Sequence, residues 1–118
     1  MSSRFARTLS ATLGPVTRPV AIPNDIDAPD AAKAQGVIEL PLRVRWSGPP
    51  RRYNLADRRD RALVYEQVLT EGTDDDVRRF IDLGQLVDLW PDLVLPRHVR
   101  QAWSRWLAER RGTVVACC

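Results

Sequence analysis

Residues 37–46 read Val-Ile-Glu-Leu-Pro-Leu-Arg-Val-Arg-Trp, and every second side chain is apolar from the second residue of this stretch to the last. A period of two is typical of a strand that buries one face and leaves the other in solvent. Pro41 has no amide hydrogen to donate, which favours a position at the edge of a sheet. Ser-Gly-Pro-Pro at 47–50 favours a turn, and residues 51–55 can return as a second strand. The stretch therefore predicts an N-terminal edge strand or a short β-hairpin.

The sequence that follows the hairpin has the periodicity of helices. Asn54 is expected to cap a first helix that ends at Gly72, and Thr73 is expected to cap a second one. A third short helix is expected over residues 83–90, capped by Asp82. Because a two-stranded sheet is only marginally stable in water on its own, these helices must supply the surface on which it packs.

The last predicted helix is the most regular one and covers residues 96–111. Pro96 suits its first turn, and Gly112 closes it. Its apolar residues repeat at the helical spacing i, i+3, i+4, i+7 and i+8, and they are Val99, Ala102, Trp103, Trp106 and Leu107. The expected fold class is therefore α+β and mostly α, with the edge strand or short β-hairpin followed by about four short helices.

Residues 1–36 differ in composition from the rest of the chain. Prolines recur there every four to six residues from residue 15 to residue 29, and large apolar residues are few. Such a segment buries too little surface to offset the entropy that is lost when it becomes ordered. We expect a disordered N-terminal arm, or one that is ordered only by a partner, and we expect the rest of the chain to function without it. Residues 37–112 then form a single small domain, and residues 113–118 form a C-terminal tail.

The composition is that of one ordinary soluble domain. Of the 118 residues, 44% are hydrophobic and 28% are charged. No apolar run approaches the roughly 18 residues that a membrane helix needs, so no membrane association is expected. Of the 18 basic residues, only Lys33 is not an arginine, a bias typical of GC-rich bacteria, and we expect a cytoplasmic protein.

The net charge of +3 is unevenly distributed along the chain. Residues 73–96 contain six acidic and two basic residues, whereas residues 97–118 contain five basic residues and one acidic residue. An acidic block therefore precedes a basic helix. Both blocks are candidates for contact with a charged partner.

The inventory of chemically active side chains is small. His98 is the single histidine, and no nucleophile or orienting acid accompanies it in the sequence. Cys117 and Cys118 stand at the very end of the chain, where they cannot cross-link distant parts of a fold. Neither the ligand spacing of a metal site nor a glycine-rich phosphate loop occurs in the sequence. The sequence therefore predicts no enzyme activity, no metal or cofactor, and no small-molecule substrate.

The chain from Leu40 to Leu107 contains the stretches PLRVRWSGPPRRYNLADRRDRALVYEQVL, beginning at Pro41, and EGTDDDVRRFIDLGQLVDLWPDLVLPRHVRQAWSRWL, beginning at Glu71. The sequence of these stretches resembles that of the small actinobacterial antitoxins that are encoded beside AbiEii-like (MenT-type) nucleotidyltransferase toxins. The resemblance implies a protein that binds and neutralises a toxin adding nucleotides to tRNA, in a hetero-oligomer with it. The resemblance assigns no catalytic residues to this chain, because such antitoxins have no catalytic motif.

A different class of function is the alternative. The longer AbiEi antitoxins contain a winged-helix DNA-binding part, and no wing is visible in this sequence. The basic last helix and the helices before it nevertheless fit a small DNA-binding transcriptional regulator. DNA is thus a possible but less favoured partner.

Several arginines and aromatic residues are expected to contact the toxin. In a domain of this size, the apolar surface of the predicted faces is larger than the chain can bury by itself. Trp and Arg are the residues that most often anchor protein interfaces. The expected contact residues are Leu42, Arg43, Arg45, Trp46, Tyr53, Arg97, Arg100 and Arg105.

Five acidic residues have two open interpretations. They either stabilise helix starts through the helix dipole or stand in for tRNA phosphates on the toxin. These residues are Asp74, Asp75, Asp76, Asp82 and Asp88.

The polar face of the predicted strand leads to a first testable prediction. Replacing Arg43 and Arg45 by alanine should weaken the complex with the toxin and leave the fold intact, because the change affects only the solvent face. Trp46→Ala should cost about 2–4 kcal/mol of binding, the usual effect of losing a central aromatic anchor. Calorimetry on the purified pair measures both effects, and circular dichroism reports folding. If the arginine variant binds the toxin normally and Trp46→Ala unfolds the chain, the strand belongs to the core and not to the interface.

Overall fold

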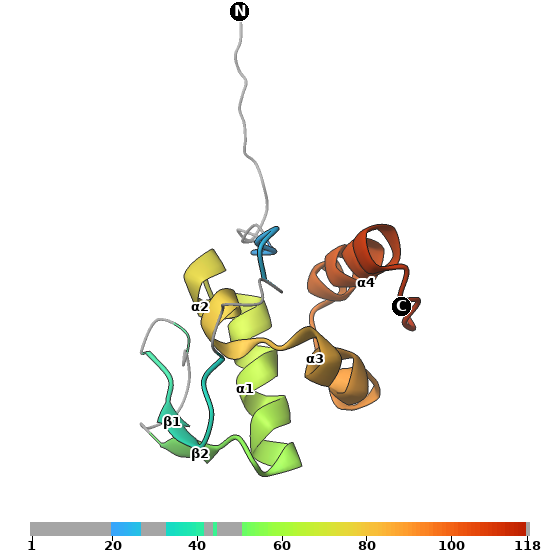
Figure 1. Cartoon of the computed structure of the whole chain (residues 1–118). Helices are drawn as coiled ribbons and strands as arrows, with labels where there is room; N and C mark the ends of the chain where they lie inside the picture. Colours follow the sequence, from blue (N-terminus) through green and yellow to red (C-terminus); the bar gives the residue numbers. More distant parts are fainter. Residues whose placement is uncertain (1–19, 27–32, 42–43, 45–50, 118) are drawn as a thin grey trace, which may run out of the picture.

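In the described part of the chain, a pair of short antiparallel strands precedes four α-helices, which confirms the expected α+β, mostly α fold (Figure 1). This computed structural model describes residues 20–26, 33–41, 44 and 51–117. The elements are β1 (Val37–Glu39), β2 (Arg52–Asn54), α1 (Arg58–Glu71), α2 (Asp74–Phe80), α3 (Leu83–Leu89), the 3-10 turn η1 (Trp90–Asp92) and α4 (Arg97–Arg111). Within these described ranges, no helix has the length and hydropathy that crossing a membrane requires.

β1 is shorter than the sequence predicts, because it ends at Glu39. Pro41 provides no amide hydrogen for a strand ladder, and its carbonyl oxygen accepts a hydrogen bond from Val44 N at 3.0 Å. Val44 N is thus bonded within its own segment and not to a neighbouring strand. The prediction of a regular strand over residues 37–46 is therefore wrong for the described residues that follow Glu39.

The predicted alternation of apolar side chains still describes which of them are buried. Leu40 is 5% exposed and Val44 is fully buried, and Ile38 is partly buried against the same core. The apolar side of this segment thus belongs to the chain's own core. Leu42 and Trp46, predicted on the same side, lie outside the described residues.

α1 begins later than predicted because a different residue caps it. The Asp57 side chain accepts hydrogen bonds from Arg59 N and Asp60 N, which is the geometry of an N-cap. Asn54, the predicted cap, ends β2, and its Oδ1 accepts a bond from Ala56 N at 3.0 Å. Its side chain therefore stabilises the turn between β2 and α1 instead of the start of the helix.

The other helix boundaries agree with the prediction to within about one residue. Thr73 and Asp76 form a capping box at the start of α2, and Asp82 caps α3 by accepting a bond from Gln85 N at 3.0 Å. Gly112 ends α4 in the left-handed conformation, with a φ of 64°. α2 and α3 have seven residues each, which is too few for a helix to persist by itself in water. Packing in the core must therefore hold them.

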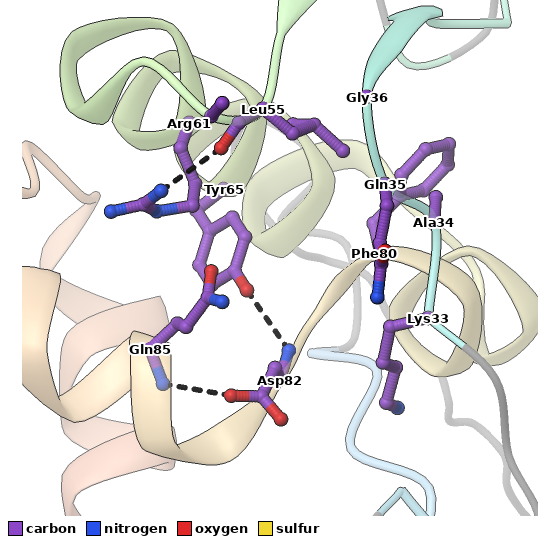
Figure 2. A pocket seen from close by; sticks show the side chains of 11 residues that line it. Lys33, Ala34, Gln35, Gly36, Leu55, Arg61, Tyr65, Phe80, Asp82 and Gln85 are labelled. Carbon is purple, nitrogen blue, oxygen red and sulfur yellow. Dashed lines mark hydrogen bonds between the residues drawn. The ribbon is translucent and has the colours of Figure 1, made fainter.

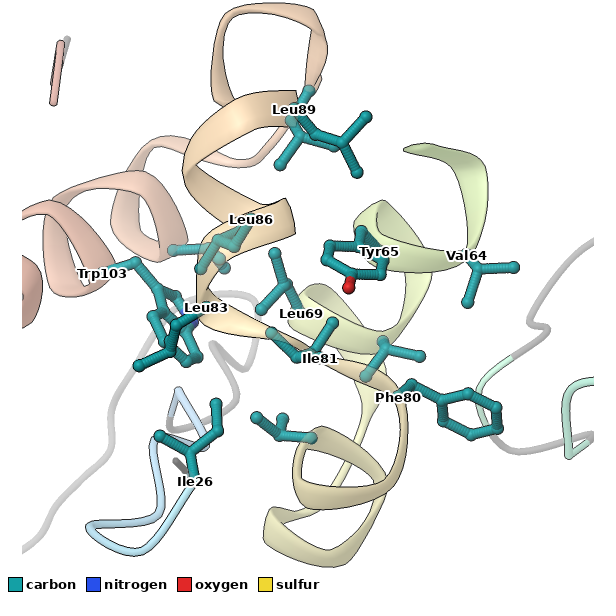
Figure 3. Close-up of a cluster of buried hydrophobic side chains, with 14 of the residues drawn as sticks. Ile26, Val64, Tyr65, Leu69, Phe80, Ile81, Leu83, Leu86, Leu89 and Trp103 are labelled. Carbon is teal, nitrogen blue, oxygen red and sulfur yellow. The ribbon is translucent and has the colours of Figure 1, made fainter. Parts of the chain in front are cut away.

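α4 contributes an apolar stripe to the core, and its Trp103 is one of the core side chains drawn in Figure 3. Val99, Trp103 and Leu107 follow each other at intervals of four residues and are at most 1% exposed. The Trp103 ring meets Trp106 edge to face, with 5.7 Å between the ring centres. Leu86 of α3 belongs to the same buried cluster. The stripe predicted for the last helix is thus confirmed as the face that α4 buries.

Part of the expected N-terminal arm is attached to the folded domain. Ile26 is fully buried in the core cluster (Figure 3). Lys33 Nζ donates to the carbonyl oxygens of Ile26 and Arg78, each at 2.7 Å. Arg110 donates to Asn24 Oδ1 at 3.0 Å. The segment before β1 therefore contacts both α2 and α4.

The expectation of an arm outside the domain over residues 1–36 is therefore wrong for the described parts of that segment. A single apolar side chain between prolines has no periodicity, so sequence patterning does not reveal that Ile26 belongs to the core. Residues 1–19 and 27–32 lie outside the described part of the chain.

The C-terminal tail folds back onto η1 and α4. Trp90 Nε1 donates to Ala116 O at 2.6 Å, and Thr113 N donates to Leu107 O at 3.0 Å. Val115 is partly buried against the core. The tail therefore covers part of the helical surface.

The burial of Ile26 leads to a prediction about stability. Ile26→Ala should lower the free energy of unfolding by about 2–5 kcal/mol, because it leaves a cavity that the core refills only in part. Val94→Ala is the control, since Val94 is 80% exposed and its loss should change the free energy by less than about 0.5 kcal/mol. Urea denaturation followed by tryptophan fluorescence measures both. Equal stability of the two variants would show that Ile26 is not part of the core.

Candidate functional site

The residues expected to contact a partner fall into different environments. Leu42, Arg43, Arg45 and Trp46 lie outside the described residues, so their role stays a prediction. The other four lie on β2 and α4, where two of them serve the fold and two face solvent.

Tyr53 belongs to the core. It is 4% exposed, and its hydroxyl oxygen accepts a hydrogen bond from Gln67 Nε2 of α1 at 3.1 Å. Arg51 covers the ring, with its guanidinium carbon 4.3 Å from the ring centre, and is itself paired with Asp60 at 2.9 Å. Tyr53 therefore fixes β2 on α1 and offers a partner almost no surface.

Arg100 also acts within the fold. Its Nη2 donates to Leu93 O at 2.7 Å and to Trp90 O at 3.5 Å, and its Nη1 donates to Ala116 O at 3.3 Å. Its guanidinium carbon lies 4.8 Å from the centre of the Trp90 ring. One side chain thus ties α4 to η1 and to the C-terminal tail. No sequence signal separates Arg100 from its neighbours, because the paths of the turn and the tail are set by tertiary packing.

Arg97 and Arg105 lie on the solvent side of α4, together with His98 and Gln101. All four are exposed, and their spacing places them along one side of the helix. Within the described residues, neither arginine has a hydrogen bond or an ion pair. We call these four residues the outer face of α4. It is the part of the predicted contact set that the structure leaves open to a partner.

The acidic residues considered as phosphate mimics are mostly engaged inside the chain. Asp76 is 4% exposed and shares the capping box with Thr73. Asp82 caps α3, and Asp88 accepts a hydrogen bond from Arg58 Nη1 at 2.5 Å. Their charges thus stabilise helix starts and the contact between α1 and α3. These contacts favour the interpretation as helix-start residues.

A cleft of about 590 Å³ was not anticipated from the sequence (Figure 2). Figure 2 shows Arg61, Tyr65 and Asp82 on one side of it, and the extended segment 33–36 with Phe80 on the other. The cleft brings together residues that are far apart in the chain. Residues that line such a cleft have no spacing in the sequence that could reveal it.

Tyr65 lines this cleft and is largely buried. Its hydroxyl oxygen accepts a hydrogen bond from Asp82 N at 3.0 Å. Burial raises the pKa of Tyr65 to about 12, because a phenolate loses hydration in the interior. The Tyr65 hydroxyl therefore stays protonated over the physiological range and can donate a hydrogen bond.

Neither a family model, nor a curated protein, nor a solved structure matches the chain. Among the described residues, no group of three or more His, Cys, Asp or Glu is arranged to hold a metal ion.

The two kinds of arginine on α4 should respond differently to substitution. Arg100→Met should lower the free energy of unfolding by about 1–3 kcal/mol, because it removes the donor to Leu93 O and the longer bonds to Trp90 O and Ala116 O. Arg97→Met removes the same charge from an exposed position and should change stability by less than about 0.5 kcal/mol. Thermal denaturation monitored by circular dichroism compares the two. An equal effect would mean that the Arg100 contacts contribute nothing to the fold.

The raised pKa of Tyr65 predicts a loss of stability at alkaline pH. A raised pKa in the folded state contributes stability that is present below the ordinary value of 10.0 and is lost as pH rises towards about 12. Tyr65→Phe should remove this part of the pH dependence, although it also removes a hydrogen bond. Tyr53→Phe is the control for loss of a tyrosine hydroxyl as such. Urea denaturation between pH 9 and pH 12 tests this, and an unchanged slope in Tyr65→Phe would contradict it.

Proposed function

We propose that this chain is the antitoxin of a toxin–antitoxin pair, and that it neutralises a nucleotidyltransferase toxin acting on tRNA by binding to it. The resemblance of residues 40–107 to actinobacterial antitoxins of this kind supports the proposal. The structural observation that supports it most is the outer face of α4, with its two unpaired arginines. The pair acts in the cytoplasm, where the toxin meets tRNA, and the antitoxin itself needs no catalytic group for this role.

Arg97 and Arg105 form no ion pair with the described residues, whereas four other described arginines do. The charges of those four arginines are balanced by carboxylates of the same chain. An arginine without such a partner can bind a carboxylate of another protein through two parallel hydrogen bonds. The ion pairs within the chain are Arg51–Asp60, Arg52–Glu39, Arg58 with Asp88 and Asp92, and Arg78 with Asp25 and Asp75.

The spacing of the two arginines suits a rim of carboxylates. Eight residues of helix correspond to about 12 Å along the axis at 1.5 Å per residue. A nucleotidyltransferase uses carboxylates to hold the Mg²⁺ that binds nucleotide phosphates. Arginines that pair with acidic groups around such a site would place α4 across its entrance. Inhibition then follows from exclusion of the nucleotide or the tRNA.

DNA binding by α4 is the second candidate function, because exposed arginines on a helix also suit phosphates. The C-terminal tail argues against it. Val114, Val115 and Cys117 border a hollow together with Ser104 and Arg105. Since the tail lies beside this side of α4, it occupies space that DNA would need if the helix entered a major groove.

Co-expression tests the proposal directly. The chain should rescue growth when it is expressed with the nucleotidyltransferase encoded by the neighbouring gene, and the two proteins should co-purify. Changing Arg97 and Arg105 to glutamate should weaken the complex by at least about tenfold, mainly through slower association at low salt. Arg59→Glu with Arg79→Glu is the matched control, since it makes the same change of charge at exposed positions of α1 and α2. Biosensor kinetics at two salt concentrations measure the difference.

Three other outcomes are informative. If the unaltered chain neither rescues growth nor co-purifies with the toxin, the proposed function is wrong. If the Arg97 and Arg105 variant binds like the unaltered chain, the function stands and the contact lies elsewhere. A salt-sensitive gel shift on the chain's own promoter, without toxin binding, would establish the DNA-binding alternative.

A further inference from the structure

The cleft shown in Figure 2 is held open by bonds of its own walls. Ala34 N donates to Arg79 O, and Leu55 N donates to Gly36 O, both at 2.8 Å. These bonds fix the extended segment before β1 as one wall. The bond that the Tyr65 hydroxyl accepts from the start of α3 fixes the other wall. The cleft is thus part of the folded structure and does not require a partner to form.

Arg61 has more hydrogen-bond donors than the fold uses. Its Nη1 donates to Leu55 O at 2.9 Å, whereas its Nε is buried and has no acceptor among the described residues. A buried donor without an acceptor costs free energy until an acceptor arrives. Tyr65 follows Arg61 by one helical turn. Its oxygen accepts the bond from Asp82 N, which leaves the hydroxyl hydrogen free to donate to a ligand.

The residues that line the cleft have a net positive charge. Lys33 and Arg61 contribute two cations, and Asp82 contributes one carboxylate that already accepts a bond from Gln85 N at 3.0 Å. Lys33 donates to two backbone carbonyls, which do not neutralise its charge. Burial lowers the pKa of Lys33 despite the opposing effect of Asp82 and Asp25. Two cations against one carboxylate leave the cleft with a net positive charge.

Phe80 on the opposite side of the cleft and Leu55 beside Arg61 add apolar surface. Its volume of about 590 Å³ falls within the range of about 300–1,000 Å³ that is usual for small-molecule sites. We propose that the cleft binds a small organic anion, either a carboxylate or a phosphate ester. Its charged group binds Arg61 and the Tyr65 hydroxyl, and its apolar part lies against Phe80 and Leu55. This site is separate from the outer face of α4 and does not depend on the proposed antitoxin function.

Titration of the full ¹⁵N-labelled chain, followed by two-dimensional NMR, tests the site. Benzoate represents the carboxylates and phenyl phosphate represents the phosphate esters. At least one of them should cause saturable shifts of the amides of Gln35, Gly36 and Ala56, which line the cleft. Benzyl alcohol lacks the charge and inorganic phosphate lacks the apolar part. Each should bind at least about tenfold more weakly than the better organic anion.

Variants within one helix separate the site from general charge effects. Arg61→Met should weaken binding of the better probe by at least about tenfold, since it removes the charged donors, and Tyr65→Phe should weaken it several-fold. Arg59→Met is the matched control, because Arg59 is exposed on the same helix and does not line this cleft. It should bind like the unaltered chain. If Arg61→Met disturbs the spectrum of the whole chain, Tyr65→Phe decides in its place.

The outcomes that overturn the proposal are distinct. Absence of saturable shifts with both organic probes means that the cleft is not an anion site. Equal weakening by Arg59→Met and Arg61→Met would show binding to surface charge in general. Inorganic phosphate that binds as tightly as phenyl phosphate would refute the role given to Phe80 and Leu55. None of these results bears on whether the chain rescues growth from the toxin.

Discussion

The fold depends on one cluster of buried apolar side chains, and the Trp103 indole is the largest of its fully buried members among the described residues. Among the described residues this indole N–H has no acceptor although it is buried, which costs about 1–3 kcal/mol. Burying the 150–250 Å² of an aromatic side chain contributes about 4–6 kcal/mol at about 25 cal/mol per Å². The hydrophobic contribution is therefore the larger one. Because α2 and α3 have only seven residues each, they need packing in this core cluster to stay helical.

The two ends of the described chain complete that core. Ile26 adds a fully buried side chain next to the helices, and Arg110 of α4 is bonded to Asn24 in the same segment. On the other side, Arg100 and Trp90 hold the C-terminal tail through Ala116 O. Both ends thus fix α4 relative to the rest. Of the regions described above, the outer face of α4 and the cleft beside α1 remain open to other molecules.

Arginine has three separate roles in this protein. Arg58 pairs with carboxylates of α3 and η1, Arg100 binds backbone carbonyls, and Arg97 has no partner among the described residues. A guanidinium serves each role equally well, because it carries five donors on a long side chain. The residue type alone therefore says little about which arginines are available to a toxin. The exposed pair Arg97 and Arg105 was among the residues predicted for contact, whereas Arg61 and its cleft were not.

The sequence by itself determined the features whose causes lie within a few residues. These are the caps at Thr73 and Asp82, the stop at Gly112 and the apolar stripe of α4, because each depends on neighbours within about one or two helical turns. Tertiary structure decided the burial of Ile26, the structural roles of Arg100 and Tyr53, and the cleft around Arg61. In each of these cases the deciding atoms belong to segments distant in the chain, and only the packing of the helices brings them together.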